Sequence, residues 1–138
     1  MPSIVWLNTA PVYVIEGNKM NSANKAEVRL VRFDDLEFVP RFEYAEMAEV
    51  SAVCGAEDGT ELGVGWGRLS NARIAWTIKY DEVLTVFEGV LNLHAIGVVH
   101  ELQPRDSIWL PKGTELVYEA EAALIHFAIH PSNWHEIE

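Results

Sequence analysis

The chain has 138 residues, of which 49% are hydrophobic, so it can bury the core of a single domain and is not a disordered chain. Its 21 acidic and 10 basic residues give a net charge of −11, which disfavours nucleic acid and anionic membrane surfaces as partners. The one cysteine, Cys54, cannot form an intrachain disulfide, and the N-terminus lacks the pattern of a signal peptide. We therefore expect a cytoplasmic protein.

The first third of the chain has mixed signals. Short β-prone runs occupy residues 4–7 and 12–15, and a polar loop follows over residues 16–25. Residues 28–33 alternate apolar and basic side chains, which predicts a half-buried edge strand. A helical turn is predicted over residues 34–38, whereas residues 42–48 fit either a helix or a strand. We expect residues 1–30 to form an N-terminal extension with short strands and residues 31–138 to form one domain.

From residue 62 onwards the sequence predicts a succession of short strands, separated by glycine, proline or acidic turns. Strands with a turn every eight to twelve residues are typical of a β-sandwich or β-barrel, and no helical period is long enough for a β-α-β unit. The predicted fold class is therefore all-β. The predicted strands cover residues 62–69, 73–79, 83–88, 90–95, 98–102, 107–110, 115–119 and 123–130.

Four residues in this region match the two signature motifs of the cupin superfamily, which the chain resembles. Glu82 and Gly89 fit the E-x6-G part of the first motif, and Pro111 and Gly113 fit the P-x-G part of the second. The resemblance implies a jelly-roll β-barrel, here with an N-terminal β extension.

The same alignment shows what the chain lacks. The two histidines of the first cupin motif fall on Trp76 and Ile78, or on Ala75 and Thr77 with the longer spacing. The histidine of the second motif falls on Leu116. The usual three-histidine metal centre is therefore not expected, and no cofactor is identified.

Four short strings also resemble the EutQ-type cupins of ethanolamine utilisation, over roughly residues 60–135. They are Gly-Trp-Gly at 65–67, Trp-Thr-Ile-Lys-Tyr-Asp-Glu at 76–82, Trp-Leu-Pro-Lys-Gly at 109–113 and Pro-Ser-Asn-Trp at 131–134. The resemblance implies a link to ethanolamine catabolism, and EutQ has an attributed acetate kinase activity and a role beside bacterial microcompartments. The residues themselves support phosphoryl transfer weakly, because the glycine-rich stretch at 63–67 has no helix after it to make a phosphate-binding loop.

Alternation along the predicted strand places Trp76, Ile78 and Tyr80 on one face, and by the cupin template Glu82 joins them inside the barrel. Such a cavity is mostly apolar, and burial there should raise the pKa of Glu82. A partly neutral carboxyl group can transfer protons or hold an amine, an alcohol or an acid. We therefore predict Glu82 and Tyr80 as catalytic residues. The predicted ligand pocket is formed by Trp66, Trp76, Ile78, Leu116 and Tyr118, with Arg68, Lys79 and Lys112 as the cations nearest its mouth.

Other interpretations of the same residues remain open. Glu82 could merely hydrogen-bond and close the barrel of a non-catalytic structural or regulatory cupin. A metal-dependent isomerase or dioxygenase would need atypical ligands, for which Glu82 and His126 are the secondary candidates. His126 faces away from the barrel if Ile125 and Phe127 face inwards, unless the strand register slips by one residue. We also expect a homodimer, formed through the N-terminal β segments and one sheet face.

Overall fold

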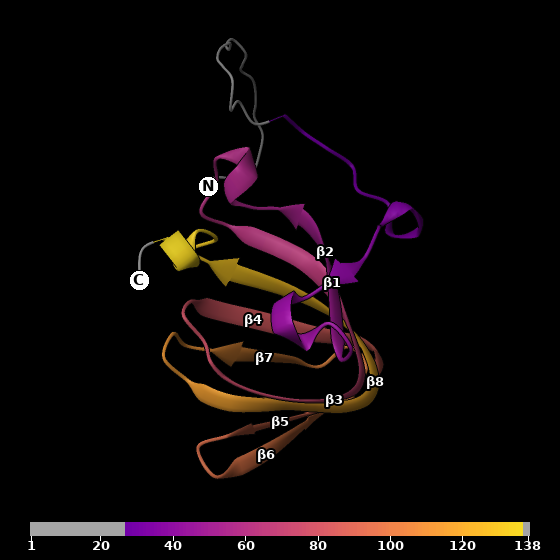
Figure 1. Ribbon diagram of the computed structural model, residues 1–138, viewed down its shortest axis with the longest axis vertical. Coiled ribbons are helices and arrows are strands. Elements are labelled where there is room, and N and C mark those ends of the chain that lie inside the picture. The colour runs from indigo at the N-terminus through magenta and orange to yellow at the C-terminus, as the bar shows by residue number, and fades with distance from the viewer. Residues whose placement is uncertain (1–26, 137–138) are drawn as a thin grey trace.

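The structure, a computed structural model, describes residues 27–136, so the strands predicted at 4–7 and 12–15 lie outside the described residues. All its strands belong to one antiparallel sheet, which confirms the all-β prediction (Figure 1). The strand order is β1-β2-β3-β8-β4-β7, and the β5-β6 hairpin joins through β8. The strands are β1 Val39–Pro40, β2 Ala48–Cys54, β3 Gly63–Thr77, β4 Asp81–Gly89, β5 Leu91–Ala95, β6 Val98–Leu102, β7 Ser107–Leu110 and β8 Glu115–His130.

The helices of the described chain are single 3₁₀ turns. They are η2 Phe33–Asp35, η3 Phe42–Tyr44, η4 Ala56–Asp58 and η5 Trp134–Glu136. None of the helices in residues 27–136 has the length and apolar character needed to cross a membrane. The predicted helical turn at 34–38 corresponds to η2, and the ambiguous stretch at 42–48 contains η3 and the start of β2.

The two longest strands, β3 and β8, run antiparallel along their whole length and wrap around the core (Figure 1). The sequence predicted each of them as two strands, with breaks near Ser70 and near residues 119–121. The structure joins the pieces, because Ser70 pairs with Ala122 and Ala72 pairs with Ala120 in an unbroken register. Asn71 absorbs the bend with a positive φ of 44°. The turn-forming residues of both strands thus lie opposite each other and form a corner, not a break.

The bent β8 strand connects the two halves of the barrel. Its second half pairs with β4, where Ile129 lies opposite Glu82, and its first half pairs with β5, where Tyr118 lies opposite Leu93. A strand that bends in this way brings Tyr118 and Glu82 to the same interior, although they lie 36 residues apart in sequence.

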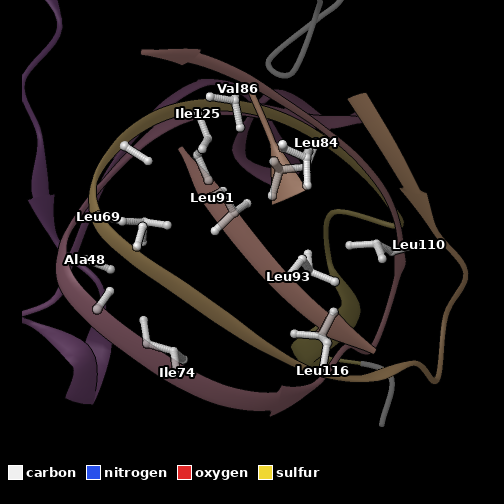
Figure 2. Close-up of a cluster of buried hydrophobic side chains, with 14 of the residues drawn as sticks. Ala48, Leu69, Ile74, Leu84, Val86, Leu91, Leu93, Leu110, Leu116 and Ile125 are labelled. Carbon is white, nitrogen blue, oxygen red and sulfur yellow. The ribbon is translucent and has the colours of Figure 1, made fainter. Parts of the chain in front are cut away.

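The core lies inside this ring of strands, and its side chains follow the two-residue alternation of each strand. Leu84 and Val86 of β4 and Leu91 and Leu93 of β5 are fully buried. Figure 2 shows them pointing inwards with leucines and isoleucines from the surrounding strands. Burying each such side chain contributes about 1.5–3 kcal/mol, so the apolar interior is the main source of stability.

The prediction of an edge strand at residues 28–33 is wrong. Residues 27–32 have no regular secondary structure, and Val28 and Leu30 are exposed to 107% and 73%. Alternation becomes a strand only where a neighbour offers hydrogen bonds. The place beside β2 is taken by β1, in which Val39 pairs with Val50.

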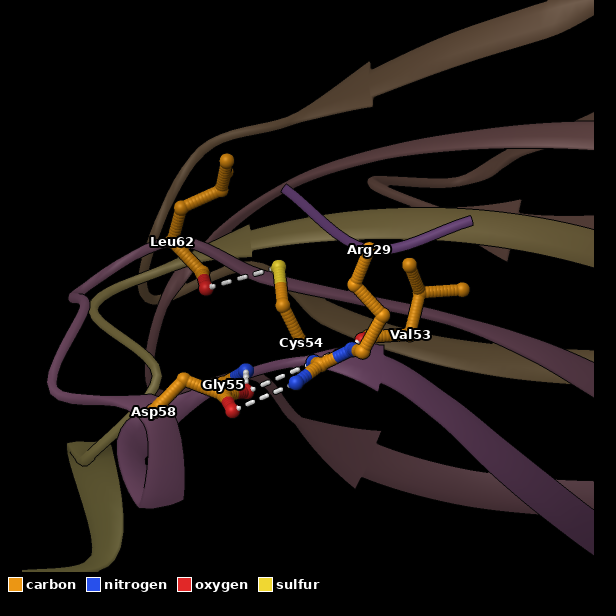
Figure 3. A network of polar contacts seen from close by, with 6 residues as sticks. All are labelled: Arg29, Val53, Cys54, Gly55, Asp58 and Leu62. Carbon is orange, nitrogen blue, oxygen red and sulfur yellow. Dashed lines mark hydrogen bonds and ion pairs between the residues drawn. The ribbon is translucent and has the colours of Figure 1, made fainter. Parts of the chain in front are cut away.

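The start of the described chain is instead held by the Arg29 side chain (Figure 3). Its guanidinium donates to the Asp58 carboxylate at 3.0 Å and to the Val53 carbonyl at 2.6 Å. The hydrogen bond from Arg29 lowers the pKa of Asp58, and the backbone N–H of Gly55 lowers it further. The half-buried thiol of Cys54 lies in the same region and donates to the Leu62 carbonyl at 3.6 Å.

Candidate functional site

A cavity of about 260 Å³ opens between β2, β3, β4, β8 and the turns η3 and η5. Its walls are mainly apolar. The aromatic residues that line it are Tyr44, Trp76, Tyr80, Tyr118, Phe127 and Trp134. The charged or polar side chains that line it are those of Arg41, Glu82, Ser132 and His135, together with the phenols. Glu49 also belongs to the lining, but its side chain lies on the outer face, because Glu49 is exposed and pairs with Arg68.

Glu82 is the buried charged group of this cavity. It sits on β4 between the exposed residues Asp81 and Val83, so the alternation of the strand directs its side chain inwards, where it is only 5% exposed. The Tyr118 phenol donates a hydrogen bond to Glu82 Oε1 at 3.0 Å. Both residues were predicted to face the interior, and the structure places them together.

Burial raises the pKa of Glu82 from its ordinary value of 4.5 to about 7. The hydrogen bond from Tyr118 and the positive charge of Arg41 lower this pKa, but they offset the loss of hydration only in part. Burial also raises the pKa of Tyr118 well above its ordinary value, and the charge of Glu82 raises it further. The carboxyl group can therefore both accept and donate a proton near neutral pH, while the phenol stays protonated.

Tyr80 lies in the aromatic wall of the cavity, which we define as Trp76, Tyr80 and Trp134. The Trp76 indole donates to the Tyr80 hydroxyl at 3.4 Å. The ring of Trp134 lies 5.6 Å from that of Trp76 and 5.4 Å from that of Tyr80, at interplanar angles of 72° and 56°. Burial raises the pKa of Tyr80, so its hydroxyl is a neutral hydrogen-bonding group of the wall.

Arg41 is a functional candidate that the sequence did not reveal. It precedes η3, and its guanidinium carbon lies 5.9 Å from the centre of the Trp76 ring. The predicted cations Arg68, Lys79 and Lys112 do not line the cavity. The guanidinium carbon of Arg68 instead lies 4.0 Å from the centre of the Phe38 ring. No local motif marks Arg41, because a fold over more than thirty residues brings it to the barrel mouth.

Three residues of the predicted pocket lie elsewhere. Trp66 points to the outside of the sheet, where its ring packs against Phe33 at 5.1 Å and Phe87 at 4.8 Å. Its position is the opposite of the predicted one because the inward positions on either side of it are the buried glycines 65 and 67. Ile78 and Leu116 do face the interior, but they are 0% and 4% exposed parts of the packed core and do not reach the cavity.

His126 is also on the outer face, as expected if its neighbours Ile125 and Phe127 face inwards, which they do. Its ring lies 4.8 Å from that of Trp66, and partial burial there lowers its pKa. Glu82 and His126 thus lie on opposite faces of the sheet and cannot share an ion. Within residues 27–136, the histidine, cysteine and acidic side chains form no group of three or more that could hold a metal.

Solved structures share this architecture. A putative ethanolamine utilization protein from Salmonella typhimurium has a TM-score of 0.71 at 21% identity, over 77% of this chain and 88% of that chain. An RmlC-like cupin from Shewanella frigidimarina has a TM-score of 0.66 at 13% identity, over 83% of this chain and all of that one, 100%. The fold is therefore a cupin jelly roll, as the signature motifs predicted.

The chain also matches a family model over most of its length. The model of the family "Ethanolamine utilisation protein EutQ" matches residues 13–136, so the chain belongs to this family. "Acetate kinase EutQ" from Salmonella typhimurium is 25% identical over 116 residues, covering 82% of this chain and 50% of the relative. The Escherichia coli protein of the same name is 24% identical over 116 residues, covering 82% and 49%. The chain spans about half the length of the curated relatives it matches.

Proposed function

We propose that this EutQ-family cupin binds, or acts on, a small polar metabolite in the cavity around Glu82. The observation that carries the proposal is a carboxyl group that is only 5% exposed, lines an open space and has a pKa of about 7. Burying such a group without full compensation costs stability, and groups of this kind cluster at functional sites. Glu82 is the residue that would exchange a proton with the ligand, and Tyr118 orients it.

The alternative is a non-catalytic cupin whose interior is filled by its own side chains. Tyr118 does satisfy one oxygen of Glu82, as this alternative requires. The remaining space of about 260 Å³ beside the carboxyl group favours a ligand instead. Well-packed interiors contain few voids larger than a water molecule.

The curated relatives carry the name acetate kinase, but the described cavity supports ligand binding better than phosphoryl transfer. Kinases surround their phosphates with several cations and backbone donors. Among the described residues that line the cavity, Arg41 is the only lysine or arginine. The glycine-rich residues at 63–67 lie inside β3 and not before a helix. The family name supports a place in the use of ethanolamine or a related metabolite, which we include in the proposal.

A thermal-shift screen of small amines, alcohols and acids tests the proposal. We expect compounds that raise the melting temperature of the wild-type protein and fail to raise that of Glu82→Gln. Glu88→Gln is the matched control, because Glu88 is an exposed carboxylate on the same strand. Compounds that stabilise wild type and Glu82→Gln equally would place the site elsewhere and contradict the proposal.

We also propose that the chain works as a homodimer through the outer face of the sheet. This face, here called the outer apolar face, carries Trp66, Val83, Phe87 and Trp109. Val83, Phe87 and Trp109 are 44%, 47% and 67% exposed. Clustered exposed apolar side chains favour an interaction surface. The segment near the start of the described chain also lies on this face, because Phe33 packs against Trp66.

A further inference from the structure

We infer that the ligand of the cavity carries a small organic ammonium group, which the Glu82 carboxylate binds beside the aromatic wall of Trp76, Tyr80 and Trp134. The inference rests on the proposed function and goes further, because it selects amines over alcohols and acids. It depends on four properties of the cavity: the hydrogen bonding of Glu82, the ring faces, the charge and the size.

The first property is the hydrogen bonding of Glu82. Tyr118 donates to Oε1, and within residues 27–136 no other side chain or backbone group donates to this carboxyl group. Among the described residues Oε2 therefore has no hydrogen-bond donor, and Glu82 lines the cavity at a position that is only 5% exposed. Leaving a buried acceptor unpaired is costly, so a ligand that donates hydrogen bonds to it gains affinity. A protonated amine brings such donors together with the opposite charge.

The second property is the aromatic wall. Its rings meet at 72° and 56°, in a T-shaped and a tilted contact, and are not stacked face to face. Aromatic faces are negative and attract cations within about 6 Å. The wall already shows this preference, because the Arg41 guanidinium lies 5.9 Å from the centre of the Trp76 ring. A carboxylate ligand would meet repulsion from the same faces.

The third property is the charge of the lining. Glu82 and Arg41 are its charged side chains, and His135, Tyr44, Tyr80 and Tyr118 are its other titratable side chains, since the Glu49 side chain lies on the outer face with Arg68. With Glu82 ionised, its charge offsets that of Arg41, so the net charge of the chain, −11, sets the sign of the surrounding field and favours a cation. An ammonium ligand would reduce the negative charge of the protein, whereas an acid would increase it.

The fourth property is size. The volume of about 260 Å³ lies below the range of about 300–1,000 Å³ that is usual for ligand pockets, which suits a free metabolite of a few heavy atoms. Three probes of equal size therefore represent the three chemical classes: n-propylamine, 1-propanol and propanoate. Their affinities for the full chain are measured by calorimetry at pH 6, 7 and 8.

We expect n-propylamine to bind more tightly than the other two probes at pH 8. Its affinity should fall by about tenfold between pH 8 and pH 6, because the protonation of Glu82, with its pKa of about 7, removes the negative partner. An acid would show the opposite sign, since its carboxylate binds better once Glu82 is neutral. Glu82→Gln should lower the affinity for n-propylamine by tenfold or more and remove its pH dependence. Glu88→Gln should leave the affinity and its pH dependence unchanged.

A second variant separates the wall from the carboxylate. Trp134→Leu should lower the affinity for n-propylamine several-fold and keep its pH dependence, because Glu82 is intact. Tighter binding of 1-propanol or propanoate through Glu82 would overturn the ammonium inference and leave the proposed function standing. The same holds if n-propylamine fails to bind while another compound from the thermal-shift screen binds through Glu82. If no compound depends on Glu82, both fail.

Discussion

The phenol of Tyr118 and the carboxyl group of Glu82 form a buried hydrogen bond of 3.0 Å between β8 and β4. The phenol donates, so the bond stabilises the ionised form of Glu82 while the apolar surroundings stabilise the neutral form. The balance leaves the carboxyl pKa near 7. This pair therefore determines how the cavity responds to pH.

Replacing Tyr118 by phenylalanine should raise the pKa of Glu82 above 7, because the hydrogen bond that lowers it is lost while burial remains. Infrared titration of the carboxyl C=O band measures this pKa directly. Tyr80→Phe is the control, since the Tyr80 hydroxyl accepts from Trp76 and does not bond to Glu82. An unchanged or lowered pKa in Tyr118→Phe would show that the bond does not act on the carboxylate.

The raised pKa of Glu82 also predicts a pH-dependent stability. The folded protein holds the Glu82 proton more tightly than the unfolded chain does, so stability falls as the pH rises from 4.5 through 7. The full cost above pH 7 is ~3 kcal/mol for a rise in pKa from 4.5 to about 7. Glu82→Gln should lose this dependence and be more stable than wild type at pH 8. Urea unfolding at pH 5 and pH 8 measures both effects, and a wild type whose stability rises over this range relative to the variant would contradict them.

Gly89 closes the first cupin motif, and we expect it to tolerate no side chain. Its φ is +79°, and a methyl group on it would overlap the backbone carbonyl of Ala122. Gly89→Ala should therefore cost at least ~2 kcal/mol, from strain and from the displaced strand. Gly97, with a φ of +74° and nothing within 4 Å, is the matched control. Gly97→Ala should cost only ~1 kcal/mol in chemical unfolding, and equal costs would argue against the backbone overlap.

The proposed homodimer can be tested on the outer apolar face. Trp109→Asp places a charge on that face, where Trp109 is 67% exposed, and should raise the dissociation constant of the dimer by tenfold or more. Ile96→Asp is the control, because Ile96 is 89% exposed at the tip of the β5-β6 hairpin. Sedimentation equilibrium measures the association. A wild-type protein that is monomeric at high concentration would reject the dimer outright.

Local patterns in the sequence predicted much of the barrel. The strands β6 and β7 begin and end where the alternation and the turn residues place them, at Val98–Leu102 and Ser107–Leu110. The inward face of Tyr80 and Glu82 was predicted by the same two-residue period, and the cupin motifs supplied the template. These features depend on neighbours in the chain, so the residues that determine them are adjacent in the sequence.

Tertiary contacts decided the rest. Residues 28–33 alternate like a strand but pair with none of the strands in residues 27–136, whereas Ser70 and Asn71 resemble a turn but stay in the strand because β3 pairs with β8. The sequence by itself determined an all-β barrel with an inward acid at Glu82. Only the folded structure places Arg41 and Trp134 beside Glu82 in the cavity lining and Trp66 on the outer face of the sheet. The physical reason is that backbone alternation acts between adjacent residues, whereas a cavity is formed by segments that become neighbours only when the sheet closes.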